Sequence, residues 1–524
     1  MSPNTSFRST AATVMQAAPA TQEDDSDPEH AFIFNDETNP CVASSSLNTT
    51  NYSANINTVR VWDVLHHRVA RHAILNTGGW GGDAKCHPGT REEVVTIVER
   101  WMDDPDGLSR IMWLNGPAGA GKTAIMRTIA DRSKDRGAHT ANFFFSREDT
   151  TRNHVQPVVV TLLYQISQLF PSAHDAVATV PYSDPLILEA SIRQQFNQLL
   201  HPLFDVIQKS SSTGTRIVLI IDAFDECDID AEHNQAQLLY ALDRLVTQEN
   251  SSVLVLVSSR LEAHIQMAFH RLSSRVQSIS LDGQYSPDKD IRRFVTAEFR
   301  KIKSSHPSAH LLTHDWPAIS DIESIVTRSA GQFLYAATVM RFLANSSIVP
   351  SHSLGEILAI SPLTPNSPFA HLDALYVHIL SMMGDHEATR DILSAWEFHE
   401  RHFNYAEKYT ATTIQRFLRH YNPGYTDEFF ESWLSDLAAI VQDCNGKLVF
   451  YHASLSEFLR DKSRSNEFYI DLDAFCAKVF PAMWRKCVGS LSFSQDIVVQ
   501  SAPSGVWASP LYPKNDPCYH RRAA

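Results

Sequence analysis

The chain has 524 residues, with 45 Lys and Arg against 59 Asp and Glu, and a formal net charge of −14 at pH 7. This acidic balance argues against nucleic-acid binding as the main activity, because it supplies no broad basic surface. Apolar runs are far shorter than the roughly 18 residues that span a bilayer, and the N-terminus shows no secretory signal. We expect a cytoplasmic protein of about three or four domains.

The seven cysteines are scattered, and their number is odd. Because no C-x-x-C pair occurs, the sequence predicts neither a disulfide framework nor a zinc site. Cys86-His87 has the residue types of half a metal site, but no second half is visible.

The N-terminal region is low in apolar residues. Residues 1–30 are rich in Ser, Thr and Ala and then acidic, a composition that predicts disorder. Between 30 and 83 the chain stays polar, with one short helix expected around Val61–Leu75. Order is expected to begin at Thr90, where Thr90-Arg91-Glu92-Glu93 fits a capping box before an amphipathic helix.

Apolar strands and helices alternate through the next part of the chain. Strands are expected at Ile111–Leu114, Ala141–Phe145, Arg216–Ile221, Val253–Val257 and Val276–Leu281. Helices are expected at Lys122–Lys134, Gln156–Phe170 and Asn234–Thr247. Continuous apolar strands separated by helices predict an α/β fold, with a parallel sheet covered by helices on both faces.

Beyond Asp288 the pattern is helical, with the strongest segments at Ile291–Lys303 and Ile322–Leu343. A Ser/Pro-rich linker follows at 350–370, and a further helical block starts at His371. In this block two apolar runs flank Asn445-Gly446, a strong hairpin signal. Helices followed by one small hairpin indicate a winged-helix domain.

The loop after the first strand has a phosphate-binding pattern. It reads Gly116-Pro117-Ala118-Gly119-Ala120-Gly121-Lys122-Thr123, which matches G-x-x-x-x-G-K-[ST], the Walker A pattern, between an expected strand and an expected helix. The backbone N–H groups of such a loop face phosphates at a helix N-terminus. Lys122 would reach the β- and γ-phosphates, and the Thr123 hydroxyl would bind Mg²⁺. We assign nucleotide binding to Gly116, Pro117, Ala118, Gly119, Ala120, Gly121, Lys122, Thr123 and Ala124.

Carboxylates follow the third strand. Asp222 ends the apolar run and is the expected Mg²⁺ ligand at the carboxyl edge of the sheet. Asp225 or Glu226 would polarise the water that attacks the γ-phosphate. The alternative for these two is a solvated acidic loop, because Asp228 and Asp230 follow directly.

The fourth strand ends in Ser258-Ser259-Arg260. An arginine at this position would sense the γ-phosphate through a charge-assisted fork. The alternative is a surface salt bridge.

Together these motifs resemble the NACHT branch of the STAND signal-transducing P-loop NTPases, in particular fungal proteins with a nephrocystin-like N-terminal NTPase domain. Asp222-Ala223-Phe224-Asp225-Glu226 resembles the Walker B motif of that family. Similar segments are Cys86-His87-Pro88-Gly89-Thr90-Arg91, Phe143-Phe144-Phe145-Ser146-Arg147 and Ser258-Ser259-Arg260. The resemblance runs from about Cys86 to Tyr469.

The resemblance implies a division of the chain. After a mostly disordered region at 1–85, it places a NACHT NTPase core at 86–285, a helical segment at 286–349, the linker at 350–370 and a winged-helix-like domain at 371–470. The remaining residues, 471–524, are too few for the repeats with which members of this class usually sense a ligand. We therefore expect a truncated member, or a partner that supplies recognition.

Two further positions carry over from the resemblance. His452 is similar to the winged-helix histidine that touches the β-phosphate of ADP; the alternative is a partly buried structural histidine. Phe333, in Gly331-Gln332-Phe333, stands where relatives outside fungi have a proline near the nucleotide base; the alternative is core packing.

The activity implied is a nucleotide-operated switch that uses ATP and ADP, with GTP possible, and Mg²⁺. ADP would clamp the NTPase core against the C-terminal domains, and ATP would favour an open form that assembles into a homo-oligomer. Hydrolysis would be slow, in the service of fungal non-self recognition or programmed cell death, with an unknown sensor or effector partner. The alternatives are a nucleotide-binding scaffold without hydrolysis and, less favoured, a small-molecule kinase.

Overall fold

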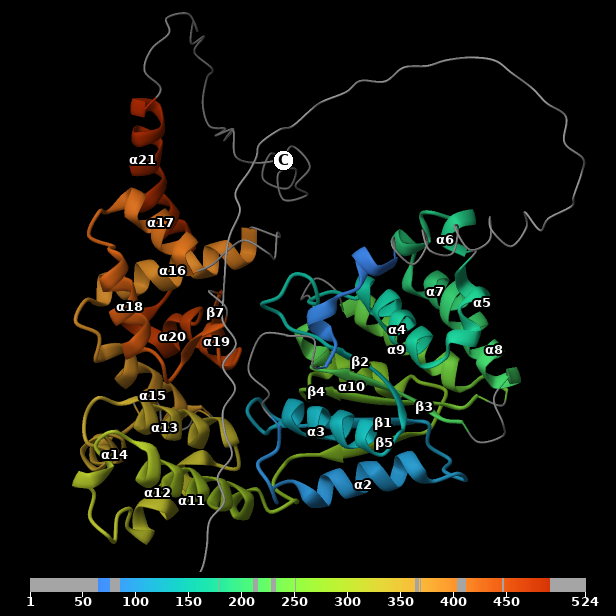
Figure 1. The fold of residues 1–524 in the computed structure, drawn as a ribbon, viewed down its shortest axis with the longest axis horizontal. Coiled ribbons are helices and arrows are strands. Elements are labelled where there is room, and N and C mark those ends of the chain that lie inside the picture. Colours follow the sequence, from blue (N-terminus) through green and yellow to red (C-terminus); the bar gives the residue numbers. More distant parts are fainter. Residues whose placement is uncertain are drawn as a thin grey trace, which may run out of the picture. The chain divides into compact units, whose positions relative to one another are not determined.

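The described part of the chain is almost continuous from the strand-rich region to the C-terminal helices (Figure 1). The computed structural model describes residues 65–75, 85–178, 180–210, 215–227, 232–249, 251–362, 367, 369–402, 411–444 and 447–490. Two predictions concern residues outside these ranges. They are the disorder predicted before residue 65 and the acidic loop that includes Asp228 and Asp230.

A five-stranded parallel sheet with the strand order β2-β3-β4-β1-β5 lies at the centre of the NTPase region. Its strands are β1 (Ile111–Asn115), β2 (His139–Phe144), β3 (Ile217–Asp222), β4 (Val253–Ser259) and β5 (Val276–Ser280). All five strands expected from the apolar runs form, and the predicted parallel sheet is confirmed. Because the strands are parallel, their carboxyl ends lie at one edge, where α/β proteins place ligands.

Helices cover both faces of this sheet (Figure 1). Met112 and Leu114 of β1 pack in a cluster with α2 (Glu92–Asp103) and α3 (Lys122–Asp135). Ile111 and Trp113 belong to the opposite cluster, with α4 (Gln156–Leu169), α9 (Glu232–Val246) and α10 (Ala263–His270). This alternation follows from the two-residue period of a strand, which sends successive side chains to opposite faces.

A run of short helices between α4 and β3 extends the second face. It comprises α5 (Asp175–Ala178), α6 (Val180–Ser183), α7 (Ile192–Gln195), a π-helical turn (Phe196–Leu200) and α8 (His201–Ser210). Their apolar residues, such as Phe196 and Leu203, join the core beneath α4 and α9. No helix was expected between Phe170 and Arg216, so these short elements were missed.

A segment before the NTPase region packs against the edge strand β2. Leu65 and Ala73 are completely buried. The backbone N–H of Leu75 donates to the Asn142 side-chain oxygen on β2 at 2.8 Å, and that of Ala70 to Thr161 Oγ1 at 3.0 Å. Residues 65–75 are therefore ordered, and their helical turns at 65–68 and Arg71–Ala73 lie within the short helix expected around Val61–Leu75.

The start of α2 also differs from the prediction. Arg91, in a left-handed conformation with φ 59°, precedes the first helical residue, and no side chain caps the helix. The Thr90 hydroxyl donates instead to the His87 carbonyl at 2.7 Å. The predicted capping box at Thr90 is therefore wrong.

The helices after the sheet are α11 (Pro287–Ser305), α12 (Ile319–Ser329), α13 (Phe333–Asn345) and α14 (Pro350–Ala359). The helix expected over Ile322–Leu343 is thus two helices, because Ala330 and Gly331 adopt φ values of 47° and 77° and end α12. The predicted linker at 350–370 is helical over its first half, where Leu354 and Ile357 of α14 are buried.

The C-terminal block is helical apart from one hairpin. It contains α15 (Ala370–Ser381), α16 (His386–His402), α17 (Ala411–Tyr421), α18 (Asp427–Asp436), β6 (Val441–Cys444), β7 (Lys447–Phe450), α19 (Ser454–Leu459), α20 (Lys462–Ser465) and α21 (Leu472–Ser490). Antiparallel pairing of Val441 with Phe450 and of Cys444 with Lys447 confirms the predicted hairpin, although its turn residues lie outside the described ranges. No helix of the described residues combines the length and the hydropathy needed to cross a membrane.

Buried apolar residues divide the described chain into two parts. The two clusters on the faces of the sheet end at Leu281, whereas one continuous cluster runs from Ile291 to Val479 and joins α11–α14 with α15–α21. We call residues 65–281 the sheet half and residues 287–490 the helical half. Because each half has its own core, contacts between them can change without unfolding either one.

The break between α12 and α13 leads to a stability prediction. Replacing Gly331 with Ala should lower the free energy of unfolding by about 1–2 kcal/mol, because a side chain disfavours its left-handed conformation. The control is Gly355→Ala in α14, an exposed helical position with open space around its Cα, which should raise stability by about 0.5–1 kcal/mol. The shift of the urea unfolding midpoint measures the stability change of each variant. Equal shifts in the two variants would contradict the conclusion that the left-handed conformation of Gly331 ends α12.

Candidate functional site

The phosphate-binding loop runs from the end of β1 to the start of α3. Gly119 and Gly121 have φ values of 74° and 88°, which favour glycine, and Gly121 directly precedes the first residue of α3. A Cβ atom added to Gly119 would lie 2.8 Å from Cβ of Leu334, the second residue of α13. The loop is therefore packed directly against the helical half.

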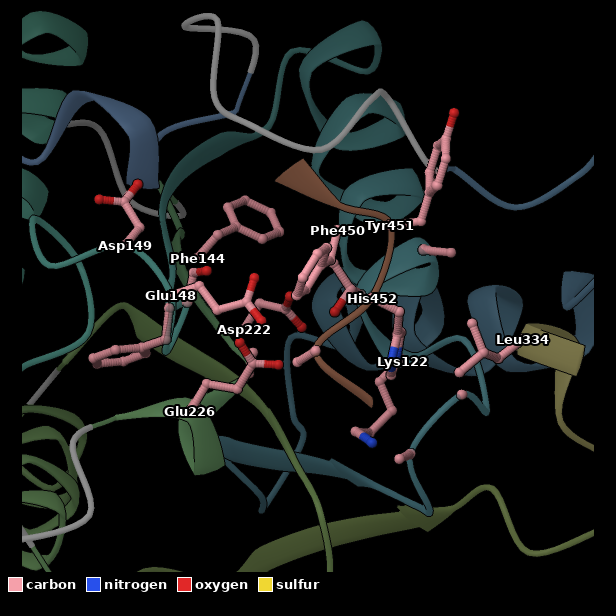
Figure 2. Close-up of a pocket in the computed structure, with 18 of the residues that line it drawn as sticks. Lys122, Phe144, Glu148, Asp149, Asp222, Glu226, Leu334, Phe450, Tyr451 and His452 are labelled. Atoms are coloured by element: carbon pink, nitrogen blue, oxygen red, sulfur yellow. The ribbon is translucent and has the colours of Figure 1, made fainter. Parts of the chain in front are cut away.

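Lys122 lies at the first position of α3. Its ammonium donates to the carbonyl oxygens of Gly116 at 2.8 Å and of Pro117 at 3.0 Å. Burial lowers the pKa of Lys122, and the charge of Asp225 acts against this shift. Figure 2 shows the side chain entering the same cavity as Asp222 and Glu226. A cation held there by carbonyl dipoles is suited to an anionic ligand.

Asp222 is the last residue of β3 and is almost completely buried. One carboxylate oxygen accepts from the Ser258 hydroxyl, which in turn accepts from the backbone N–H of Ala223 at 3.0 Å. The other oxygen, Oδ2, has no hydrogen-bond partner among the described residues. Burial raises the pKa of Asp222, whereas hydrogen bonds from Ser258 and Thr123 oppose the rise. A buried carboxylate oxygen without a partner beside a threonine hydroxyl fits a divalent cation such as Mg²⁺.

Asp225 and Glu226 follow on a short 3-10 turn, and the structure separates their surroundings. Asp225 is buried; it accepts from the Arg260 backbone N–H at 2.9 Å and pairs with Arg260 Nε at 3.1 Å. Its carboxylate is thus committed to holding Arg260.

Glu226 keeps part of its side chain open to the cavity, and its Oε2 accepts from the Arg147 N–H at 3.3 Å. Burial, with the charge of Asp225, raises the pKa of Glu226 to about 7. This carboxylate is suited to accept a proton near neutral pH.

Arg260 has two ionic partners, one in each half. Besides Asp225, its Nη2 lies 2.6 Å from Glu457 Oε1 on α19. The side chain is 22% exposed and lines the cavity. Arg260 therefore forms salt bridges and also faces the site, and its role as a phosphate sensor stays a prediction.

His452 follows β7 and enters the cavity from the helical half (Figure 2). Its Nδ1 accepts from the backbone N–H of Ser454 at 3.0 Å, so the proton of the neutral ring is on Nε2. Burial lowers the pKa of His452 to about 3, and the nearby charges of Arg260 and Lys122 act in the same direction. The ring is therefore a neutral hydrogen-bond donor at physiological pH.

One cavity of about 330 Å³ brings most of the predicted site residues together. The predicted residues that line it are Ala118, Gly119, Gly121, Lys122, Thr123, Ala124, Asp222, Asp225, Glu226, Arg260 and His452. The predicted loop residues Gly116, Pro117 and Ala120 lie outside the lining; a Cβ on Gly116 would lie 2.9 Å from Cβ of Leu281. The sheet half and the helical half both contribute to the lining.

Phe333 and Arg91 connect the loop to the helical half. Phe333 lines the cavity and also packs against the helical core, with its ring 6.2 Å from that of Phe294. The buried Arg91 guanidinium lies 5.1 Å from the centre of the Phe333 ring and donates to the Ala120 carbonyl at 3.0 Å. The backbone N–H of Arg91 donates to Asp290 Oδ2 at 2.8 Å. Sequence reasoning quoted Arg91 in a motif but gave it no role.

Arg147 and Glu457 were also missed. Arg147 donates to the Asp225 carbonyl at 3.0 Å, and its Nη1 lies 3.9 Å from Glu457 Oε1. Arg147 ends the Phe143–Arg147 segment. Glu457 ends the pattern Ser454-x-x-Glu457, which predicts a capping box, but no side chain caps α19 and Glu457 pairs with arginines of the sheet half instead.

Comparison with known proteins agrees with this geometry. Residues 89–260 match the family described as nephrocystin 3, N-terminal. The chain is 26% identical over 351 residues to the vegetative incompatibility protein HET-E-1 of Podospora anserina. The match covers 64% of this chain but only 23% of that protein, so the chain spans less than a quarter of the length of this curated relative.

Two solved ATPase structures from Pyrococcus species also match part of the chain. One is a Signal Transduction ATPase with Numerous Domains (STAND) protein with a tetratricopeptide repeat sensor from Pyrococcus horikoshii, at 13% identity, with 78% of this chain and 47% of that chain covered and a TM-score of 0.37. The other is a Walker-type ATPase of Pyrococcus abyssi, at 11% identity, with 72% and 98% covered and a TM-score of 0.35.

The family match covers the loop, the three carboxylates Asp222, Asp225 and Glu226, and Arg260 at its last residue. The parallel sheet and the G-x-x-x-x-G-K-[ST] loop are those of a P-loop NTPase. Residues 89–260 thus match the nephrocystin 3 N-terminal family, and together these findings support a NACHT/STAND-type P-loop NTPase.

Proposed function

We propose that this chain is a nucleotide-operated STAND-type switch that binds ATP or ADP with Mg²⁺ and hydrolyses ATP slowly. GTP is the alternative nucleotide. The observation that carries the proposal is the cavity itself, where a phosphate-binding loop, carboxylates and an arginine of the sheet half face a histidine of the helical half. A ligand that contacts both halves can control how they are held together.

Binding would rest on the loop and the start of α3. The loop N–H groups and the helix dipole favour an anion, and Lys122 adds a full charge. Thr123 and Asp222 would hold Mg²⁺, which when bound neutralises phosphate charge. Asp222 is suited to this role because its Oδ2 has no hydrogen-bond partner among the described residues.

Hydrolysis would depend on Glu226 and Arg260. Glu226, with a pKa of about 7, would accept a proton from the attacking water. Asp225 would act as a positioning residue, because it holds both the backbone and the side chain of Arg260. Arg260 would place its guanidinium against the terminal phosphate.

The helical half would close the switch through His452. We assign residues 371–470 to a winged-helix domain, with the β6–β7 hairpin as its wing and His452 as its latch. The Nε2–H of His452 would donate to the β-phosphate of ADP and hold the halves together. Exchange for ATP would favour an open form, which we expect to assemble into a homo-oligomer in the cytoplasm.

The biological role is proposed from the curated relative. By its name that protein acts in vegetative incompatibility. We extend to this chain a role in fungal non-self recognition and programmed cell death, with a sensor or effector protein as partner.

Lys122→Ala should weaken ADP and ATP binding by about 100-fold or more, because it removes a charged hydrogen-bond donor to the phosphates. Isothermal titration measures the affinity, and circular dichroism checks that the fold is intact. Lys134→Ala is the matched control, since Lys134 is exposed on the same helix. Parent-like binding by Lys122→Ala would refute the phosphate site.

Glu226→Gln should retain nucleotide and reduce phosphate release by about 100-fold or more, because an amide cannot accept the proton. Below pH 7 the parent carboxyl is largely protonated, so its hydrolysis rate should rise with pH and level off above about 7. The variant should lose this dependence. Steady-state phosphate release across pH measures both. A parent rate no higher than that of the variant would favour the scaffold without hydrolysis.

His452→Ala should raise the dissociation rate of ADP by about tenfold, because one phosphate hydrogen bond is lost. Since the pKa of His452 is about 3, ADP release from the parent should not change between about pH 5.5 and 8 through this residue. Stopped-flow release of a fluorescent ADP measures the rate. His310→Ala, exposed in the helical half, is the control; unchanged release from His452→Ala would remove the latch.

A further inference from the structure

Polar contacts between the two halves converge on Glu457 of α19. Its Oε1 lies 2.6 Å from Arg260 Nη2 and 3.9 Å from Arg147 Nη1. Both arginines belong to the sheet half, where they follow β4 and β2. The side chains of Arg260 and Glu457 are each 22% exposed, so their attraction is screened less than that of a surface pair.

The Arg260 guanidinium is divided between the halves. Its Nε and backbone N–H are held by Asp225, within the sheet half, while Nη2 is directed to Glu457. The side chain also lines the cavity beside Lys122 and Glu226. Asp225 thus fixes the base of the guanidinium, and its outer nitrogens remain available for an anion from either the helical half or the cavity.

We propose that Glu457 competes with the terminal phosphate of ATP for Arg260. The inference rests on the proposed function and adds its regulation. A γ-phosphate carries more charge than a carboxylate and presents several acceptor oxygens, so it would draw Nη2 away from Glu457. ADP has no such group and leaves the Arg260–Glu457 pair intact.

Competition of this kind provides what a switch needs, a difference in affinity of two ligands for two forms. In the closed form, ATP must displace Glu457 before Arg260 reaches the phosphate, whereas ADP binds without that cost. In the open form Glu457 is already separated from Arg260. Compared with ADP, ATP therefore shifts the equilibrium between the two forms toward the open one.

Glu457 also lies near the backbone that positions His452, the proposed latch. The Ser454 N–H that fixes the His452 ring and the Glu457 backbone both belong to the first turn of α19, where the Glu457 N–H donates to the Ala453 carbonyl at 3.0 Å. Ser454 is buried, and its hydroxyl lies 3.0 Å from the Tyr376 hydroxyl. Displacement of Glu457 would therefore move a turn that also positions His452.

Other contacts between the halves lie elsewhere. Asp290 accepts from the Arg91 N–H at 2.8 Å, and Arg293 Nη1 donates to the Gly89 carbonyl at 2.6 Å. Both involve the first turns of α11, close in the chain to the junction of the halves. We expect these contacts to remain when Arg260 and Glu457 separate, so that the junction acts as a hinge.

The test is Glu457→Gln in the full chain, which removes the charge and keeps the size of the side chain. Titration with ADP and with a non-hydrolysable ATP analogue, both with Mg²⁺, gives the ratio of the two dissociation constants. That ratio should shift toward the ATP analogue by about fivefold or more. Glu467→Gln, the same change at an exposed residue of the helical half, should match the parent.

The ratio distinguishes regulation from simple damage, because general loosening of the fold weakens both nucleotides alike. Glu457→Asp keeps the charge but shortens the reach to Arg260, so it should shift the ratio in the same direction and serves if the Gln variant does not fold. A ratio within twofold of the parent in the folded variant, with both nucleotides still bound, overturns the inference and leaves the proposed function standing. A parent that binds neither nucleotide overturns both.

Discussion

Asp222, Asp225 and Glu226 leave the end of β3 within one short stretch of chain, and burial opposes the charge that each would carry. Each of the three carboxylates has different neighbours in the structure. Ser258 hydrogen-bonds Asp222, Arg260 contacts both oxygens of Asp225, and the pKa of Glu226 is raised to about 7. Lys122 and Arg260, both in the sheet half, are the positive groups that face these carboxylates.

The two halves meet through polar groups as well as apolar ones. Apolar residues are gathered in separate cores that end at Leu281 and begin again at Ile291. Between them Arg260 pairs with Glu457, and Gly119 lies against Leu334 with no room for a side chain. An apolar interface would resist opening whatever the ligand, whereas a polar one responds to a new anion or cation.

Local signals were sufficient for the sheet and the loop, because β1, β3 and β4 contain uninterrupted apolar runs and the loop has a fixed spacing. They failed where distant residues decide the outcome. The capping box at Thr90 is wrong because the Arg91 N–H is bound by Asp290, 199 residues away, and Arg91 takes a left-handed conformation. Glu457 could not be found for the same reason, since its partner follows a strand in the other half.

The free energy needed to operate a switch is larger than one hydrogen bond to the nucleotide supplies. Moving an equilibrium from 1:99 to 99:1 requires about 5.5 kcal/mol of differential binding, and a hydrogen bond to a charged group contributes about 1.5–3 kcal/mol. His452 alone therefore cannot operate a complete switch. In the proposed switch, His452 would hold the closed form through the β-phosphate that both nucleotides carry, and Glu457 would supply a difference between ADP and ATP in that form. Because both groups belong to one turn of chain around α19, the two contacts act on the same movement.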